Sequence, residues 1–178
     1  MPDIVPFAQA GHLFEDFEHT AFRLETRRGY ATDRAGARFR AFLDGRPPLY
    51  EPDAPWSVSV RASVAAGKRF ERVRLVDDPP TDGQRFLLAS GLGNVEAGED
   101  IRNLWRTDAE QLGLPEFDFW LFDSRVLARF HFDADDVTLG VELIRDPGQV
   151  LAACQARDAA WHHAVPTTEF GARVASGV

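Results

Sequence analysis

The sequence is poor in cysteine and lysine. Cys154 is the only cysteine and Lys68 the only lysine among 178 residues. A single cysteine excludes an intramolecular disulfide, and it excludes any zinc or iron–sulfur centre built from several cysteines. Because this pattern is typical of a reducing compartment, we expect a cytoplasmic protein whose core needs no covalent cross-link.

Long apolar runs are also missing. No stretch approaches the roughly 18 consecutive apolar residues that a membrane-spanning helix needs. Residues 1–6 lack the basic region and the apolar region of a signal peptide. The sequence therefore predicts neither export nor a membrane partner.

An excess of positive charge is absent as well. The chain carries 20 Lys and Arg against 28 Asp and Glu, for a formal net charge of −8. This balance opposes direct binding to nucleic acid, because contacts to phosphates require a concentrated basic surface. Arginines do gather in residues 23–40 and 61–74. They indicate either solvated faces paired with nearby acids or a cationic pocket for a small anionic ligand.

What is abundant is apolar and aromatic surface. The hydrophobic fraction is 44%, with 14 Phe and 4 Trp along the chain. A chain of this length buries about 70% of its unfolded surface when it folds as one unit. We therefore expect residues 1–178 to form a single domain, with a proline-rich loop over 46–55 and a flexible tail over 171–178.

Hydrophobic periodicity predicts alternating helices and strands, and then consecutive strands. Helical spacing and caps predict helices over 7–18, 33–45, 55–66, 81–91, 107–112 and 146–166. Gly91, Gly93 and Asn94 are expected to end the fourth of these. Period-two alternation predicts strands over 20–26, 70–76, 99–104, 117–124, 126–132 and 137–144. In the strand over 20–26, the polar residues are expected to point outward.

The order of these elements predicts an α+β fold with a mixed or antiparallel sheet and flanking helices. The last three strands should form a meander that a long C-terminal helix follows. Alternation within 117–124 places Asp118, Trp120 and Phe122 on one face and Phe119, Leu121 and Asp123 on the other.

Motifs for catalysis and metal binding are missing. No glycine-flanked serine elbow and no phosphate-binding glycine loop occur, and the Gly91-x-Gly93 pair carries Glu96 where a third glycine would stand. The five histidines lack metal-ligand spacing, and His162 and His163 are adjacent, so they point about 100° apart on a helix. We predict no catalytic residue, no metal and no cofactor.

Three segments carry a resemblance to a known family: 72–86, 97–102 and 114–123. In these segments, and over about 7–170, the chain resembles an uncharacterised domain family of actinobacteria. Members of that family are often encoded beside helix-turn-helix regulators of the WhiJ type. The resemblance implies a regulatory protein that acts through such a DNA-binding partner. The family has no assigned activity, so the resemblance assigns no catalytic role to any residue.

The C-terminal third is similar to sensor domains related to phospholipase D that have lost their chemistry, and no His-x-Lys pair is present. This second resemblance implies a domain that senses or binds. With the nearby acids added, the candidate ligand-binding residues are Arg72, Arg74, Asp82, Arg85, Asp100, Arg102, Asp118, Trp120 and Asp123.

We therefore interpret the chain as a non-enzymatic regulator or sensor in development or specialised metabolism. Its expected partners are a helix-turn-helix regulator, a small anionic ligand and, as an open possibility, a second copy of the chain. The alternative is an enzyme that handles phosphoesters, a nuclease or hydrolase, whose cleft would combine the acids and arginines Asp77, Asp82, Arg85, Asp100 and Arg102.

Overall fold

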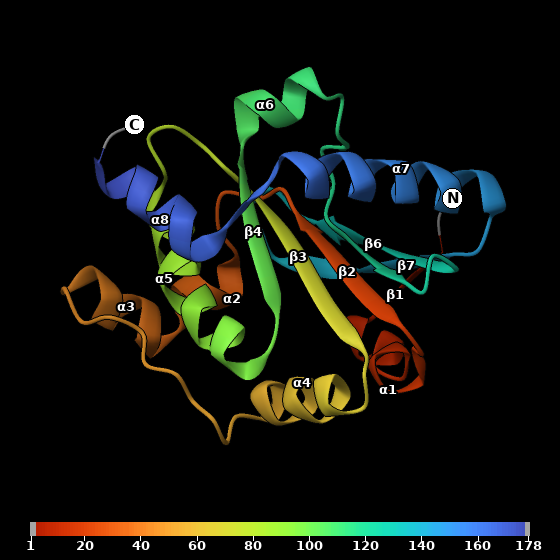
Figure 1. Ribbon diagram of the computed structural model, residues 1–178, viewed down its shortest axis with the longest axis horizontal. Coiled ribbons are helices and arrows are strands. Elements are labelled where there is room, and N and C mark those ends of the chain that lie inside the picture. The colour runs from red at the N-terminus through yellow and green to blue at the C-terminus, as the bar shows by residue number, and fades with distance from the viewer. Residues whose placement is uncertain (1–2, 177–178) are drawn as a thin grey trace.

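The computed structural model describes residues 3–176 and places every described strand in one sheet, in the order β1-β7-β6-β5-β2-β3-β4-β8 (Figure 1). The strands are β1 (Ile4–Val5), β2 (Thr20–Glu25), β3 (Arg69–Val76), β4 (Asp100–Trp105), β5 (Phe119–Phe122), β6 (Val126–Phe132), β7 (Thr138–Ile144) and β8 (Val165–Pro166). Strands β2, β3 and β4 pair in parallel, and all other neighbours pair antiparallel. The predicted α+β fold with a mixed sheet and a β5-β6-β7 meander is confirmed.

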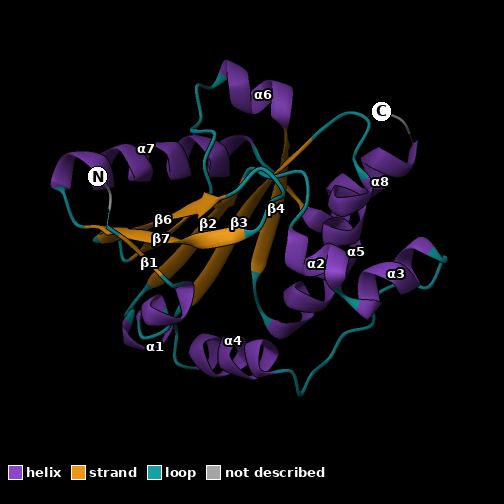
Figure 2. Cartoon of the chain, turned by 180° about the vertical axis from the view of Figure 1, so that it is seen from behind, coloured by secondary structure: helices purple, strands orange, loops and turns teal. Residues whose placement is uncertain are grey.

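Helices cover both faces of this sheet. They are η1 (Phe7–Ala10), α1 (Leu13–Asp16), α2 (Ala31–Ala35), α3 (Ala37–Leu43), α4 (Pro55–Ala65), α5 (Asp82–Ala97), α6 (Arg106–Gln111), α7 (Pro147–His163) and α8 (Thr167–Ser176). Helix α7 lies along one face, whereas α1 and α4 lie on the other (Figures 1 and 2). No helix within residues 3–176 has the length and apolar character needed to cross a membrane.

The two faces have separate cores because side chains alternate along each strand. Phe22, Leu24, Phe119 and Leu121 belong to the core beneath α7. Trp120 and Phe122 of β5 belong to the core on the opposite face, with residues of α1 and α4. The faces predicted for the residues of β5 are confirmed.

Two of the predicted helices are divided at glycines. The helix expected over 7–18 consists of η1 and α1, with Gly11 and His12 between them. The helix expected from Asp33 begins earlier, after Tyr30, and divides at Gly36, whose backbone is extended (φ −77°, ψ 149°). Glycine has a low helix propensity, so a break at these positions costs little.

Helix α5 is longer than predicted. The predicted N-cap, Thr81, is confirmed, and it forms a capping box with Gln84. However, Gly91 and Gly93 do not end the helix, which continues to Gly98 in the left-handed conformation (φ 117°). A Cβ atom on Gly91 would lie 2.5 Å from Nη1 of Arg74. The missing side chain at Gly91 therefore lets the buried guanidinium of Arg74 approach the helix closely. It does not end the helix.

The C-terminal segment contains elements that the sequence patterns did not indicate. The long helix predicted after Asp146 is confirmed as α7, and its last residue is His163. Strand β8 then adds to β4, and α8 packs through the buried Phe170, whose ring lies 4.5 Å from that of Trp105. The tail expected over 171–178 is therefore helical through Ser176, and residues 177–178 lie outside the described part.

The packing of Gly91 leads to a prediction about stability. We expect Gly91→Ala to destabilise the protein by about 1–3 kcal/mol, because the added methyl displaces the Arg74 guanidinium. Gly171 lies in α8 with nothing within 4 Å of its Cβ position, so Gly171→Ala should stabilise by up to about 1 kcal/mol. Urea unfolding measures both. Equal stabilisation by the two substitutions would contradict the assigned contact.

Candidate functional site

Four charged side chains lie on one face of the two central parallel strands. They are Arg23 and Glu25 of β2 and Arg72 and Arg74 of β3, and all four are buried. In the β2–β3 register Arg23 is level with Arg72, and Glu25 with Arg74. Alternation brings these residues to the face that α4 and α5 cover, so the expected outward direction of the β2 polar residues is wrong.

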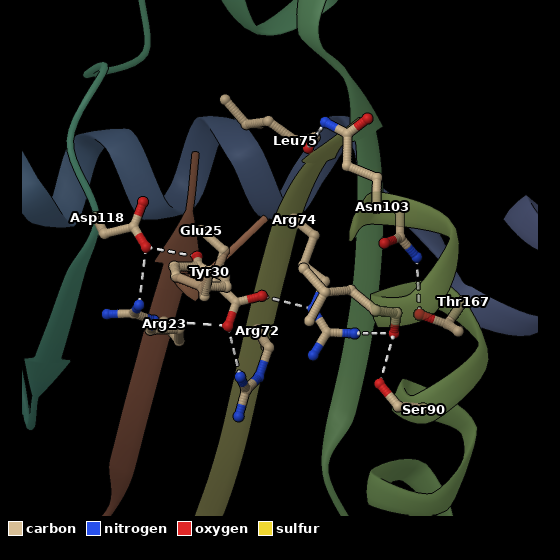
Figure 3. A network of polar contacts seen from close by, with 12 residues as sticks. Arg23, Glu25, Tyr30, Arg72, Arg74, Leu75, Ser90, Asn103, Asp118 and Thr167 are labelled. Atoms are coloured by element: carbon tan, nitrogen blue, oxygen red, sulfur yellow. Dashed lines mark hydrogen bonds and ion pairs between the residues drawn. The ribbon is translucent and has the colours of Figure 1, made fainter. Parts of the chain in front are cut away.

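Glu25 lies between the arginines of β3 (Figure 3). One carboxylate oxygen accepts a hydrogen bond from Nη1 of Arg72 at 2.6 Å, and the other accepts one from Nε of Arg74 at 2.5 Å. The remaining Arg72 donors go to Glu99, at 3.1 and 2.9 Å. Glu99 also accepts from the indole of Trp56 at 2.5 Å, which joins helix α4 to the network.

Asp118, the residue immediately before β5, completes the network. It accepts hydrogen bonds from Nη2 of Arg23 at 2.8 Å and from the Tyr30 hydroxyl at 2.6 Å. It also accepts from the backbone N–H and the hydroxyl of Thr26, at 2.7 and 2.8 Å. The network thus combines the three arginines Arg23, Arg72 and Arg74 with the three carboxylates Glu25, Glu99 and Asp118, so their formal charges cancel.

The contacts fix the ionisation of these groups. Burial alone would raise the pKa of Glu25, but the charges of Arg74, Arg72 and Arg23 outweigh burial and hold this pKa well below its ordinary range. Burial raises the pKa of Tyr30, and the neighbouring charges of Glu25 and Asp118 raise it further. At neutral pH, Glu25 is therefore a carboxylate and Tyr30 a neutral phenol.

A pocket of about 1260 Å³ opens above this network. Arg23, Glu25, Arg72 and Arg74 form its floor, and its walls come from η1, helices α1 to α5 and strands β5, β6 and β7. Much of the wall is aromatic, with Phe7, Phe14, Tyr30, Trp56, Phe86, Trp120 and Phe130. The combination of a polar floor with aromatic walls is typical of a site for a small molecule.

One fully buried donor in the floor has no partner. Nη1 of Arg23 is buried and makes no hydrogen bond within the protein. The same guanidinium lies 4.0 Å above the ring of Phe130, and its Nε is 3.7 Å from Glu25, beyond hydrogen-bond distance. A buried donor without an acceptor costs about 1–3 kcal/mol. This cost makes Nη1 of Arg23 the point of the pocket that most favours a ligand.

The structure brings some of the candidate residues to this site. Arg72, Arg74 and Trp120 line the pocket, and Asp118 holds Arg23 in its floor. Asp123 instead accepts the backbone N–H groups of residues 18, 19 and 20, at 2.7–2.9 Å, so it anchors the start of β2.

The remaining candidates form separate surface pairs. Asp82 pairs with Arg85 at 3.2 Å in the first turn of α5, and Asp100 pairs with Arg102 at 3.3 Å at the start of β4. Asp77 follows the end of β3, where it pairs with Arg106 at 2.8 Å. Because β3 and β4 are parallel, Asp77, after the end of β3, and Asp100, at the start of β4, lie at opposite ends of these two strands. These residues therefore do not form the cleft predicted for an enzyme that handles phosphoesters.

Sequence reasoning did not select Arg23, Glu25, Tyr30, Trp56 or Glu99. One signal in the sequence could have indicated this site. Strands β2 and β3 each carry a pair of charged residues on one face, and central parallel strands are covered on both faces, so these charges had to be buried. As to metals, the described residues contain no group of three or more His, Cys, Asp or Glu side chains that could hold an ion.

The overall fold resembles that of a phospholipase D family member. The model is similar to the crystal structure of Nuc from Salmonella typhimurium, a phospholipase D family member, with a TM-score of 0.50 and 11% sequence identity. The likeness covers 93% of this chain and 98% of that one. The chain belongs to the family described as "Domain of unknown function (DUF6879)", whose model matches residues 8–172. No curated protein matches its sequence significantly.

The Glu25 contacts predict how stability depends on pH. Because the pKa of Glu25 is lower in the folded state than its ordinary value of 4.5, its contribution is present above about pH 4.5 and is lost as the pH falls below that. We expect Glu25→Gln to cost about 3–5 kcal/mol near neutral pH, where it leaves buried arginines underpaired. This difference from wild type should shrink as the pH falls through about 4.5.

Urea unfolding at a series of pH values measures this difference. The control is Glu51→Gln at the exposed pair with Arg38, 3.5 Å apart. It should change stability by no more than about 0.5 kcal/mol at any pH. A pH-independent effect of Glu25→Gln would contradict the ionic assignment.

Proposed function

We propose that this protein binds a small molecule in the pocket above the buried network and acts as a sensor and not as an enzyme. The observation that supports this proposal most is the site itself: an aromatic-walled pocket of about 1260 Å³ whose floor contains a buried arginine with an unused donor. Pockets of this construction are the usual places where proteins bind small molecules.

The state of the floor groups favours binding over catalysis. Both oxygens of Glu25 are occupied by arginines, and its low pKa makes it a poor general base near neutral pH. Among the described residues that line the pocket, there is no histidine or cysteine. The floor is therefore suited to hold a ligand and not to exchange protons with it.

Filling the pocket should abolish ligand binding. Ser59 of α4 lines the pocket, so Ser59→Trp places a bulky ring inside it. Ala62 lies on the exposed side of the same helix, which makes Ala62→Trp a matched control. We expect small molecules that raise the melting temperature of wild type to bind Ala62→Trp equally and Ser59→Trp at least about ten-fold more weakly. Hits that bind both variants alike would count against this pocket.

The regulatory role proposed for the protein rests on the family resemblance and on charge. A net charge of −8 disfavours direct contact with nucleic acid, so we propose that the signal passes through a helix-turn-helix regulator. The purified protein and the regulator encoded beside it should form a stoichiometric complex in size-exclusion chromatography. If the two fail to associate both with and without cell extract, the partner proposal fails.

A further inference from the structure

The unused donor on Arg23 restricts what the ligand offers. Arg23 is 5% exposed and lines the pocket, and its Nη2 already binds Asp118 at 2.8 Å. Nη1 carries two N–H groups and has no acceptor in the protein. Because Nη1 is buried in the unliganded protein, the guanidinium must turn slightly toward the pocket before a ligand's oxygen or nitrogen acceptor can contact it. That contact then removes the cost of an unsatisfied buried donor.

The balance of charge restricts the ligand further. The three floor arginines are already matched by Glu25, Glu99 and Asp118, and each carboxylate accepts an arginine N–H. The pocket lining adds two further acids, Glu15 and Asp33, and one further arginine, Arg38.

No net positive charge therefore remains to compensate a buried anion. Bringing an unpaired anion into such a place is costly. Although the sequence indicated an anionic ligand, this balance favours an uncharged one.

The walls indicate the shape of the ligand. Trp120 and Trp56 lie 6.1 Å apart between ring centroids, and Phe14 lies 5.1 Å from Trp120. Both tryptophans, Phe14 and Phe130 line the pocket. Aromatic surfaces of this kind bind flat rings by stacking or by edge-to-face contact.

On the basis of the proposed function, we propose that the ligand is an uncharged, planar aromatic molecule with a carbonyl-type acceptor, which Nη1 of Arg23 binds. Arg23 is then the residue that determines specificity, and the surrounding rings supply most of the contact area. The carboxylates of the floor hold Arg23 in place and do not contact the ligand's acceptor.

Three probes with one ring system test this proposal: acetylnaphthalene with an uncharged acceptor, ethylnaphthalene without an acceptor, and naphthoate with a negative charge. Their dissociation constants are measured by ligand-observed NMR with wild type, Ser59→Trp and Arg23→Lys. Arg23→Lys retains the charge opposite Asp118 but removes the second arm of the guanidinium. Arg46→Lys, at the exposed pair with Asp44 and outside the pocket lining, is the matched control.

We expect wild type and Arg46→Lys to prefer acetylnaphthalene about ten-fold over both other probes, as one satisfied buried donor implies. Arg23→Lys should lose this preference while it still binds ethylnaphthalene. If Arg23→Lys does not fold, the guanidinium NMR signals of the wild-type protein provide the test instead. Only acetylnaphthalene should shift the Nη1 signal of Arg23.

The other outcomes separate the two proposals. Equal binding of acetylnaphthalene and ethylnaphthalene, abolished by Ser59→Trp, would overturn the acceptor inference and retain the pocket, with water as the partner of Nη1. A preference for naphthoate that requires Arg23 would overturn only the uncharged class. If no probe binds, or if Ser59→Trp has no effect on binding, the proposed function itself fails for this class of ligand, and the inference fails with it.

Discussion

The buried ionic network on one face of the sheet is the constraint on which the rest of this structure depends. Each of its charges has lost its hydration, so each needs a protein partner in a fixed place. The β2–β3 register sets Glu25 between Arg72 and Arg74, and further contacts attach the surrounding segments. Trp56 attaches α4 through Glu99, and Arg74 attaches α5 through the carbonyl of Leu87. A shift of any one element would leave a charge unpaired.

The same constraint links the fold to the proposed function. The sheet has parallel central strands with both faces covered, and α7 closes one face with an apolar core. The opposite face carries the network (Figure 3), and residues of the helices on that face line the pocket together with it. Replacing a buried ionic network by packed apolar side chains is often neutral or stabilising, so stability alone does not account for these charges. We infer that they are retained because they hold Arg23 in place at the floor of the pocket.

Much of this fold could be predicted because it follows from local patterns. Alternation located the strands, the Asp146-Pro147 cap located α7, and the cap at Thr81 located the start of α5. The site was harder to predict. Arg23 has the alternation of a solvent-facing residue, and only the tertiary cover of β2 makes it a buried one. Gly91 likewise has the sequence pattern of a helix end, but the reason for a glycine there is its contact with Arg74 of strand β3.

The most direct test of this account is an atomic-resolution crystal structure of the protein purified from its own organism, without added ligands. The account predicts the neutral network in place and density for a flat non-protein molecule against the aromatic wall, with an acceptor within about 3 Å of Nη1 of Arg23. An Arg23 guanidinium whose N–H groups are all bonded to protein atoms, beneath a pocket filled by its own side chains, would contradict it.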